Sequence, residues 1–190
     1  MSSLVESIRA EYMRYRALAE AAMGQLNDDE LAAQSAATNN SIATICWHLA
    51  GNFQSRFSDF LTSDDEKPWR RRDEEFQRRT PTRDELFAKW EQGWQVLTGA
   101  LTSLTDDDLQ RTITIRRQPM AVHEALHRSL AHAAYHVGQI VYIAKSLRGR
   151  EWKSLSIPPG QSDTYNQNAK SERPSAHAAA LAELGGRKTT

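Results

Sequence analysis

Cysteine is scarce in this chain, because Cys46 is the single cysteine among 190 residues. A disulfide needs two cysteines, so an intramolecular disulfide framework is excluded, and the composition suits a reducing compartment. The first nine residues carry charges where a signal peptide has an unbroken apolar run. No segment approaches the roughly 20 consecutive apolar residues that cross a bilayer. The sequence therefore predicts a soluble, cytoplasmic protein without a membrane partner.

The chain also lacks net charge. Its 24 lysines and arginines balance 24 aspartates and glutamates, which gives a formal net charge of zero. A chain without excess positive charge creates no long-range field that would draw it to nucleic acid or to an anionic membrane. We therefore expect no nucleic-acid partner.

Four segments have the apolar spacing of amphipathic helices, with apolar residues at intervals of three and four. Helical starts are marked by the N-cap candidates Asn39-Asn40-Ser41, by Thr82 with Glu85 as a capping box, and by Pro119 at a position where helices begin. The predicted helices span residues 4–26, 42–60, 82–105 and 119–147. At about 1.5 Å per residue they match the side of an antiparallel bundle. The fold class expected is all-α, a four-helix bundle.

The remaining segments predict connections and a tail. Residues 62–80 are polar and read as a long connection, and residues 112–115 alternate like a strand that is too short and partnerless to alter the fold class. We expect one bundle domain over residues 1–150 and an irregular, partly disordered C-terminal extension over residues 151–190. Within this tail, residues 176–184 form a short helix at most.

Three histidines carry the main chemical signal. His132 and His136 are four residues apart on one predicted helix, so their imidazoles face the same way, and His48 on another helix could complete a three-histidine set for one metal ion. Three histidine ligands leave a coordination position for water or substrate, which is the arrangement of a catalytic site. The default interpretation of a lone histidine is structural, but burying two imidazoles without partners is costly.

The last helix contains a second pair at the same spacing, His123 and His127. At about 100° per residue this pair falls opposite His132 and His136, so the two pairs cannot bind one ion. His123 and His127 are assigned to the surface or to a helix contact.

Several further residues have weaker signals. Asn52 and Gln139 lie about one turn beyond His48 and His136, where an amide could orient a ligand or contact a substrate, or could simply be polar at the end of a bundle. Arg72, within Arg70-Arg71-Arg72, could bind a carboxylate or phosphate, although the acidic residues around it favour a solvated loop of mixed charge. Trp69 either covers the site or packs, and packing is preferred. Cys46 is expected in the core.

Two motifs together resemble a known family. They are Cys46-Trp47-His48-Leu49-Ala50-Gly51-Asn52 and Ala131-His132-Ala133-Ala134-Tyr135-His136-Val137-Gly138-Gln139. Over residues 1–150 the chain resembles the DinB-like, or YfiT-like, metal-binding bundle superfamily, and in particular a branch of unknown function that carries segments like Lys67-Pro68-Trp69-Arg70 and Arg72-Asp73-Glu74-Glu75-Phe76.

The resemblance implies a four-helix bundle with long crossing connections, often a homodimer. It also implies a divalent metal ion such as zinc or nickel, held by His48, His132 and His136. Three histidines on their own suit zinc, nickel, copper or iron. Members with known activity are transferases or isomerases that use low-molecular-weight thiols.

The leading hypothesis is a metal-dependent enzyme of the thiol-transferase or hydrolase kind, which acts on a small molecule through a metal-bound thiolate or hydroxide. The alternative is a non-catalytic stress-response or binding module in which the metal is structural. A bundle without metal is the third possibility.

Overall fold

The structure is a computed structural model that describes residues 3–34, 36 and 38–184. It is mostly helical, with 66% of residues in helices and a single two-stranded sheet among the described residues. The α-helices are α1 (Leu4–Met23), α2 (Asp28–Ala32), α3 (Ile42–Phe57), α4 (Arg83–Ser103), α5 (Val122–Arg148), α6 (Ser162–Gln167) and α7 (Pro174–Leu184). Short 3-10 helices are η1 (Arg72–Phe76), η2 (Asp106–Gln110) and η3 (Gly149–Glu151). None of the helices in this part of the chain is long and apolar enough to cross a membrane.

The four long helices lie where their apolar spacing predicts them, with shorter ends. Ser41 caps α3, and Thr82 and Glu85 form the predicted capping box of α4. α1 ends at Met23, before the predicted residue 26. Asn27 and Glu30, which were expected only to end this helix, form a capping box that starts α2. α3 stops before residue 60 because Ser58 takes an extended conformation, with ψ of 125°, and Asp59 then adopts a positive φ of 50°.

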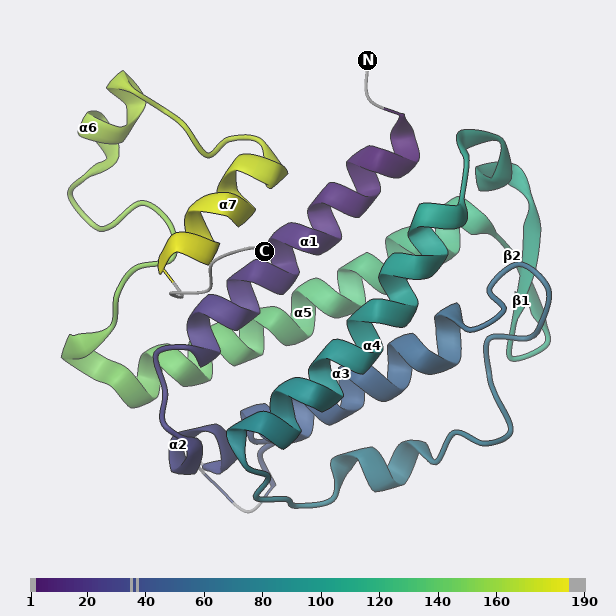
Figure 1. Ribbon diagram of the computed structural model, residues 1–190, viewed down its shortest axis with the longest axis horizontal. Coiled ribbons are helices and arrows are strands. Elements are labelled where there is room, and N and C mark those ends of the chain that lie inside the picture. Colours follow the sequence, from purple (N-terminus) through teal and green to yellow (C-terminus); the bar gives the residue numbers. More distant parts are fainter. Residues whose placement is uncertain (1–2, 35, 37, 185–190) are drawn as a thin grey trace.

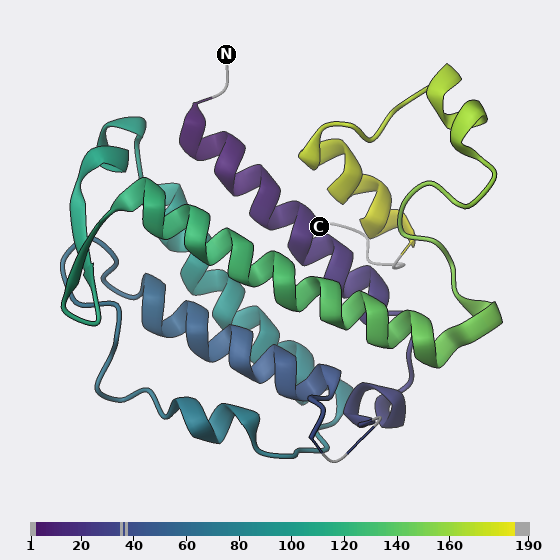
Figure 2. The ribbon, with the colours of Figure 1, turned by 180° about the vertical axis from the view of Figure 1, so that it is seen from behind.

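The four long helices lie side by side in two pairs (Figure 1). α3 packs mainly against α4, and α1 mainly against α5. Within each pair the two helices run in the same direction, and the pairs run opposite to each other (Figures 1 and 2). The pairing is parallel rather than antiparallel because residues 58–82 return the chain along the outer side of α3 before α4 begins.

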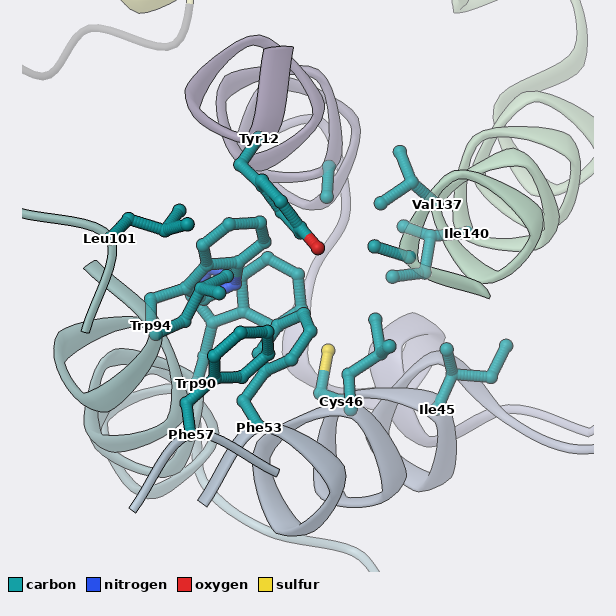
Figure 3. Close-up of a cluster of buried hydrophobic side chains, with 14 of the residues drawn as sticks. Tyr12, Ile45, Cys46, Phe53, Phe57, Trp90, Trp94, Leu101, Val137 and Ile140 are labelled. Atoms are coloured by element: carbon teal, nitrogen blue, oxygen red, sulfur yellow. The ribbon is translucent and has the colours of Figure 1, made fainter. Parts of the chain in front are cut away.

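All four helices contribute to one hydrophobic core. Tyr12 of α1, Phe53 of α3 and Trp94 of α4 are fully buried and meet near the centre of the molecule, with Ile140 of α5 facing them (Figure 3). The Tyr12 hydroxyl donates a hydrogen bond to the Leu126 carbonyl at 3.0 Å, which joins α1 to α5. Large aromatic side chains thus hold the helices at fixed positions.

The segment before α5 differs from the expectation. Residues Thr112–Ile115 are strand β1, and they have a partner, because β2 (Gln118–Ala121) pairs with them antiparallel. Pro119 lies inside β2 rather than at a helix start, opposite Thr114. Arg116 and Arg117 form the turn with positive φ, stabilised by hydrogen bonds from their backbone N–H groups to the Asp64 carboxylate. The strand expectation was right and the absence of a partner was wrong.

The C-terminal extension contains more regular structure than its composition predicts. Residues 162–167 form α6, and α7 covers the short helix that was expected there. α7 packs against α1, where its Leu181 is only 1% exposed (Figure 2). Residues 185–190 of the tail lie outside the described residues.

The docking of α7 can be tested at Leu181. Because Leu181 is buried against the core, Leu181→Ala should lower the free energy of unfolding by about 2 kcal/mol or more. Leu184→Ala is the matched control, since Leu184 is 57% exposed on the same helix and its truncation should change stability by less than about 0.5 kcal/mol. Chemical denaturation of both variants measures the difference, and equal effects would show that α7 does not belong to the cooperative fold.

Candidate metal centre

His48, His132 and His136 come together between α3 and α5. The ring centroids lie 5.2 Å apart for His48 and His132, 4.9 Å for His48 and His136, and 4.6 Å for His132 and His136. One nitrogen from each ring lies within 4.8 Å of the other two. His48 is 4% exposed and His136 7% exposed, whereas His132 is half-buried. The three predicted histidines therefore form one largely buried group that could hold a metal ion.

The hydrogen bonds of the Nδ1 atoms in His48 and His136 show which nitrogen of each ring is left to bind a metal ion. His48 Nδ1–H donates to Glu75 Oε2, and His136 Nδ1–H donates to Gln139 Oε1, both at 2.8 Å. With Nδ1 as the donor, each Nε2 keeps its lone pair. His48 Nε2 lies 3.1 Å from His132 Nε2. Two nitrogens bound about 2.05 Å from one ion would be roughly 2.9 Å apart if the angle at the ion were a right angle, and about 3.3 Å apart if it were tetrahedral. The 3.1 Å between the two Nε2 atoms lies between these values.

Glu75, in the connection between α3 and α4, is fixed by two partners. Arg70 Nε donates to Glu75 Oε1 at 2.9 Å and Arg70 Nη2 donates to Oε2 at 3.0 Å, in a bidentate pair. The Arg70 side chain is only 2% exposed. Burial raises the pKa of the Glu75 carboxyl, but the hydrogen bonds from His48 and Arg70 outweigh it and leave this pKa below its usual value. Glu75 is therefore a carboxylate that orients His48.

Gly51 makes room for this carboxylate. It lies on α3, nearly one turn after His48, where η1 packs against the helix. A Cβ atom at Gly51 would lie 2.7 Å from Glu75 Cδ and closer still to Oε1. Any larger residue would push Glu75 away from His48, so a glycine is needed here for close approach and not for its backbone angles.

The surroundings keep His132 and His136 neutral. Burial, followed by the positive charges that His136 and His48 would carry, lowers the pKa of His132 to about 3. Burial likewise lowers the pKa of His136, with the Gln139 hydrogen bond partly opposing it. A neutral imidazole is the form that binds a metal ion, so no proton has to be displaced at neutral pH.

A cavity of about 230 Å³ opens beside the histidines. Its wall includes His48 and His132, together with Asn52 and Arg72 from the residues tentatively assigned to substrate binding. Gln139 is not on this wall but holds His136 in place. Trp69 neither covers the site nor packs, because it is 55% exposed and lines a separate groove with Trp47.

Sequence reasoning missed Glu75 and Arg70. Arg70-Arg71-Arg72 was interpreted as a solvated loop because acidic residues flank it, yet the Arg70 and Glu75 side chains are buried as a pair. The usable signal was Phe76, a rare apolar residue in a polar connection, whose ring packs on His48 with centroids 4.6 Å apart. An apolar anchor there places Glu75 against α3.

The other predicted assignments agree with the structure. His123 Nδ1–H donates to the Leu109 carbonyl at 2.9 Å, and His127 is exposed, so this pair serves a helix contact and the surface. Cys46 is fully buried in the core, and burial raises the pKa of its thiol.

Comparison with known proteins gives a family without a known activity. The sequence pattern of DUF1572, a family described as a protein of unknown function, matches residues 1–161, and the chain belongs to this family. No curated protein matches the chain, and no solved structure matches it either.

The contact between Gly51 and Glu75 gives a prediction. Gly51→Ala should cost about 1 to 3 kcal/mol of stability, because it displaces a buried carboxylate from its hydrogen bonds. Gly138→Ala is the control on α5, where an added Cβ has no heavy atom within 4 Å and should stabilise the helix by about 0.5 to 1 kcal/mol. Chemical denaturation compares them, and equal stabilities would show that Glu75 does not approach α3 this closely.

Proposed function

We propose that this DUF1572 protein is a metalloenzyme of the DinB-like four-helix-bundle type, in which His48, His132 and His136 hold one divalent ion. The observation that carries the proposal is the convergence of three imidazoles beside a cavity that two of them line. Three nitrogen ligands leave the fourth position of a tetrahedral ion for a small molecule, as in catalytic zinc sites. The two parallel helix pairs, with the long connection that crosses back from the end of α3 to the start of α4, support the bundle type.

The donor chemistry fits such an ion. Imidazole nitrogens suit zinc and nickel, which are the metals we propose. When bound, a divalent ion lowers the pKa of a coordinated water or thiol toward neutrality. Glu75 and Gln139 hold the Nδ1–H groups of His48 and His136, and an outer hydrogen bond of this kind fixes ring orientation and raises ligand basicity.

Residues of the chain also line the cavity in which a substrate would bind. The buried pair of Arg70 and Glu75 holds His48 rigidly, and Asn52 and Arg72 face the cavity next to it. We propose a thiol-transferase or hydrolase reaction on a small molecule that enters this cavity. A low-molecular-weight thiol, a homodimer, a cytoplasmic location and the boundary of the bundle domain at residue 150 stay predictions of the sequence.

The alternative is a stress-response or binding module in which the ion is structural. One feature favours it: the histidine group joins α3, α5 and the segment around η1, so an ion bound there would tie three elements together. Under this alternative the cavity would bind a ligand or a partner without turnover.

Metal content tests the proposal directly. Purified protein should contain close to one equivalent of zinc or nickel per chain, and His132→Ala should lose it, because two remaining histidines bind a divalent ion much more weakly. His127→Ala is the control, since His127 is exposed on the same helix and should keep the metal. Elemental analysis of the three proteins provides the measurement. A metal-free protein whose stability does not change in His132→Ala would refute the proposal.

A combined melting and turnover experiment separates the enzyme from the structural module. In an enzyme, a chelator should abolish turnover of thiol and electrophile substrates or of hydrolysable esters, while metal-loaded protein is active. In a structural module, the chelator should lower the melting temperature by several degrees, since a loss of about 1 kcal/mol shifts it by roughly 2 to 8 °C in domains of 60 to 250 residues. No turnover by metal-loaded protein on any substrate class, with a large chelator shift, would favour the module.

A further inference from the structure

The cavity beside the histidines is lined by an unusual number of arginines. They come from four different parts of the chain: α3, the connection after it, the β-hairpin turn and α5. The five are Arg56, Arg70, Arg72, Arg116 and Arg128, and Asp65 is the one carboxylate on the same wall. Guanidinium groups from separate elements that meet around one cavity form a typical anion-binding arrangement.

Partners account for some of this charge but not all of it. Arg70 is paired with Glu75, Arg116 Nε donates to Glu66 at 2.8 Å, and Arg72 lies 3.7 Å from Asp73. Burial raises the pKa of Asp65 to about 7 against the opposing effect of Arg56 and Lys67, so its negative charge is only partial at neutral pH. On the wall itself five arginines thus face the single carboxyl group of Asp65, while Glu75, Glu66 and Asp73 pair with three of the arginines from outside it.

Two of the arginines have donors to spare. Arg56 is 14% exposed, its Nη2 lies 3.6 Å from Glu66, and its Nη1 is buried without a hydrogen-bond partner among the described residues. Arg128 is exposed at the cavity wall one turn before His132, and it forms no hydrogen bond or ion pair within the described part of the chain, so its donors are open to a ligand. The unpaired nitrogen of Arg56 is costly because it is buried, and buried polar groups are nearly always satisfied.

Asp65 adds an unused acceptor to the same cavity. Its side chain is buried, and neither carboxyl oxygen has a hydrogen-bond partner among the described residues. The backbone around it is fixed, since its N–H donates to the Thr114 carbonyl and its carbonyl accepts from Ser55 Oγ. Unused donors and an unused acceptor at one cavity point to a polar ligand that satisfies both.

We propose that the cavity beside His48 and His132 is the binding site of a small substrate with a carboxylate or phosphate group, which Arg56 and Arg128 hold. This inference rests on the proposed function for its reaction, but the binding itself depends only on the arginines. The anionic group takes the free guanidinium donors, and a hydroxyl or amino group of the same molecule donates to Asp65. At about 230 Å³ the cavity lies below the size of sites for drug-sized ligands, which is roughly 300 to 1,000 Å³, so the substrate is small.

The geometry also positions the substrate for the reaction. Arg128 and His132 lie on one face of α5, and Asn52 and Arg56 follow His48 by one and two turns of α3. An anion held between Arg56 and Arg128 would therefore lie next to the histidine group, with the rest of the molecule directed toward it. Arg56 and Arg128 act as binding residues in this scheme.

Anion titrations of the protein as purified test the inference. The probes are inorganic phosphate and lactate, with glycerol as the uncharged control, each titrated at constant ionic strength while the melting temperature and the binding isotherm are followed. Phosphate, lactate or both should raise the melting temperature, and which of them binds more tightly distinguishes a phosphate from a carboxylate substrate. Arg128→Gln should weaken this binding roughly tenfold or more, as expected for the loss of a charged hydrogen bond.

Matched variants keep the outcomes distinct. Lys145→Gln removes one positive charge from an exposed position on α5 away from the cavity and should bind the anions like wild type. Arg56→Gln is the second test, and Arg128→Gln stands alone if Arg56→Gln fails to fold. Metal content is measured on every variant, so that loss of the metal is seen separately from loss of anion binding.

Two results would overturn the inference while leaving the metal site intact. One is a protein with metal that neither phosphate nor lactate stabilises. The other is anion binding that survives in Arg128→Gln and Arg56→Gln but disappears in His132→Ala, because the anion would then bind at the histidine group rather than at the arginines.

Discussion

The hydrogen bond between His48 and the buried Glu75 carboxylate is the interaction on which the site depends. It joins α3 to the long connection and leaves His48 Nε2 free to face His132. The carboxylate itself depends on Arg70, whose bidentate contact compensates the cost of burying a charge, and on Gly51, which leaves room for it. A polar connection of about 25 residues is thereby held against the helices.

The path of this connection also explains the topology. By returning along α3, it makes α3 and α4 run in the same direction, and the β-hairpin then leads into α5 at the end of the molecule where α3 stops (Figure 1). The hairpin turn contributes Arg116 to the cavity, and the start of the connection contributes Asp65. One end of the helical core therefore collects the histidines, the arginines and the small cavity, while the aromatic core fills the space between the helices (Figure 3).

Much of the helical content could be predicted because local patterns specify it. The capping box of Thr82 and Glu85 and the spacing of the apolar residues depend only on neighbours in the chain. The errors occurred where local signals compete: Asn27 starts a helix as readily as it ends one, and Pro119 fits a strand edge as well as a first helical turn. The hairpin partner was missed because Gln118–Ala121 has no alternating pattern of its own.

The sequence by itself determined the helices and placed His132 and His136 on one face of α5, because helical periodicity brings residues i and i+4 to the same side of a helix. It also indicated His48, on another predicted helix, as the residue that could complete the set. Only the tertiary structure decided that Glu75 orients His48, that Arg70 is buried, and that Arg56, Asp65 and Arg128 share a cavity. Those contacts join residues on different elements of the chain, and long-range packing, which has no local periodicity, brings them together.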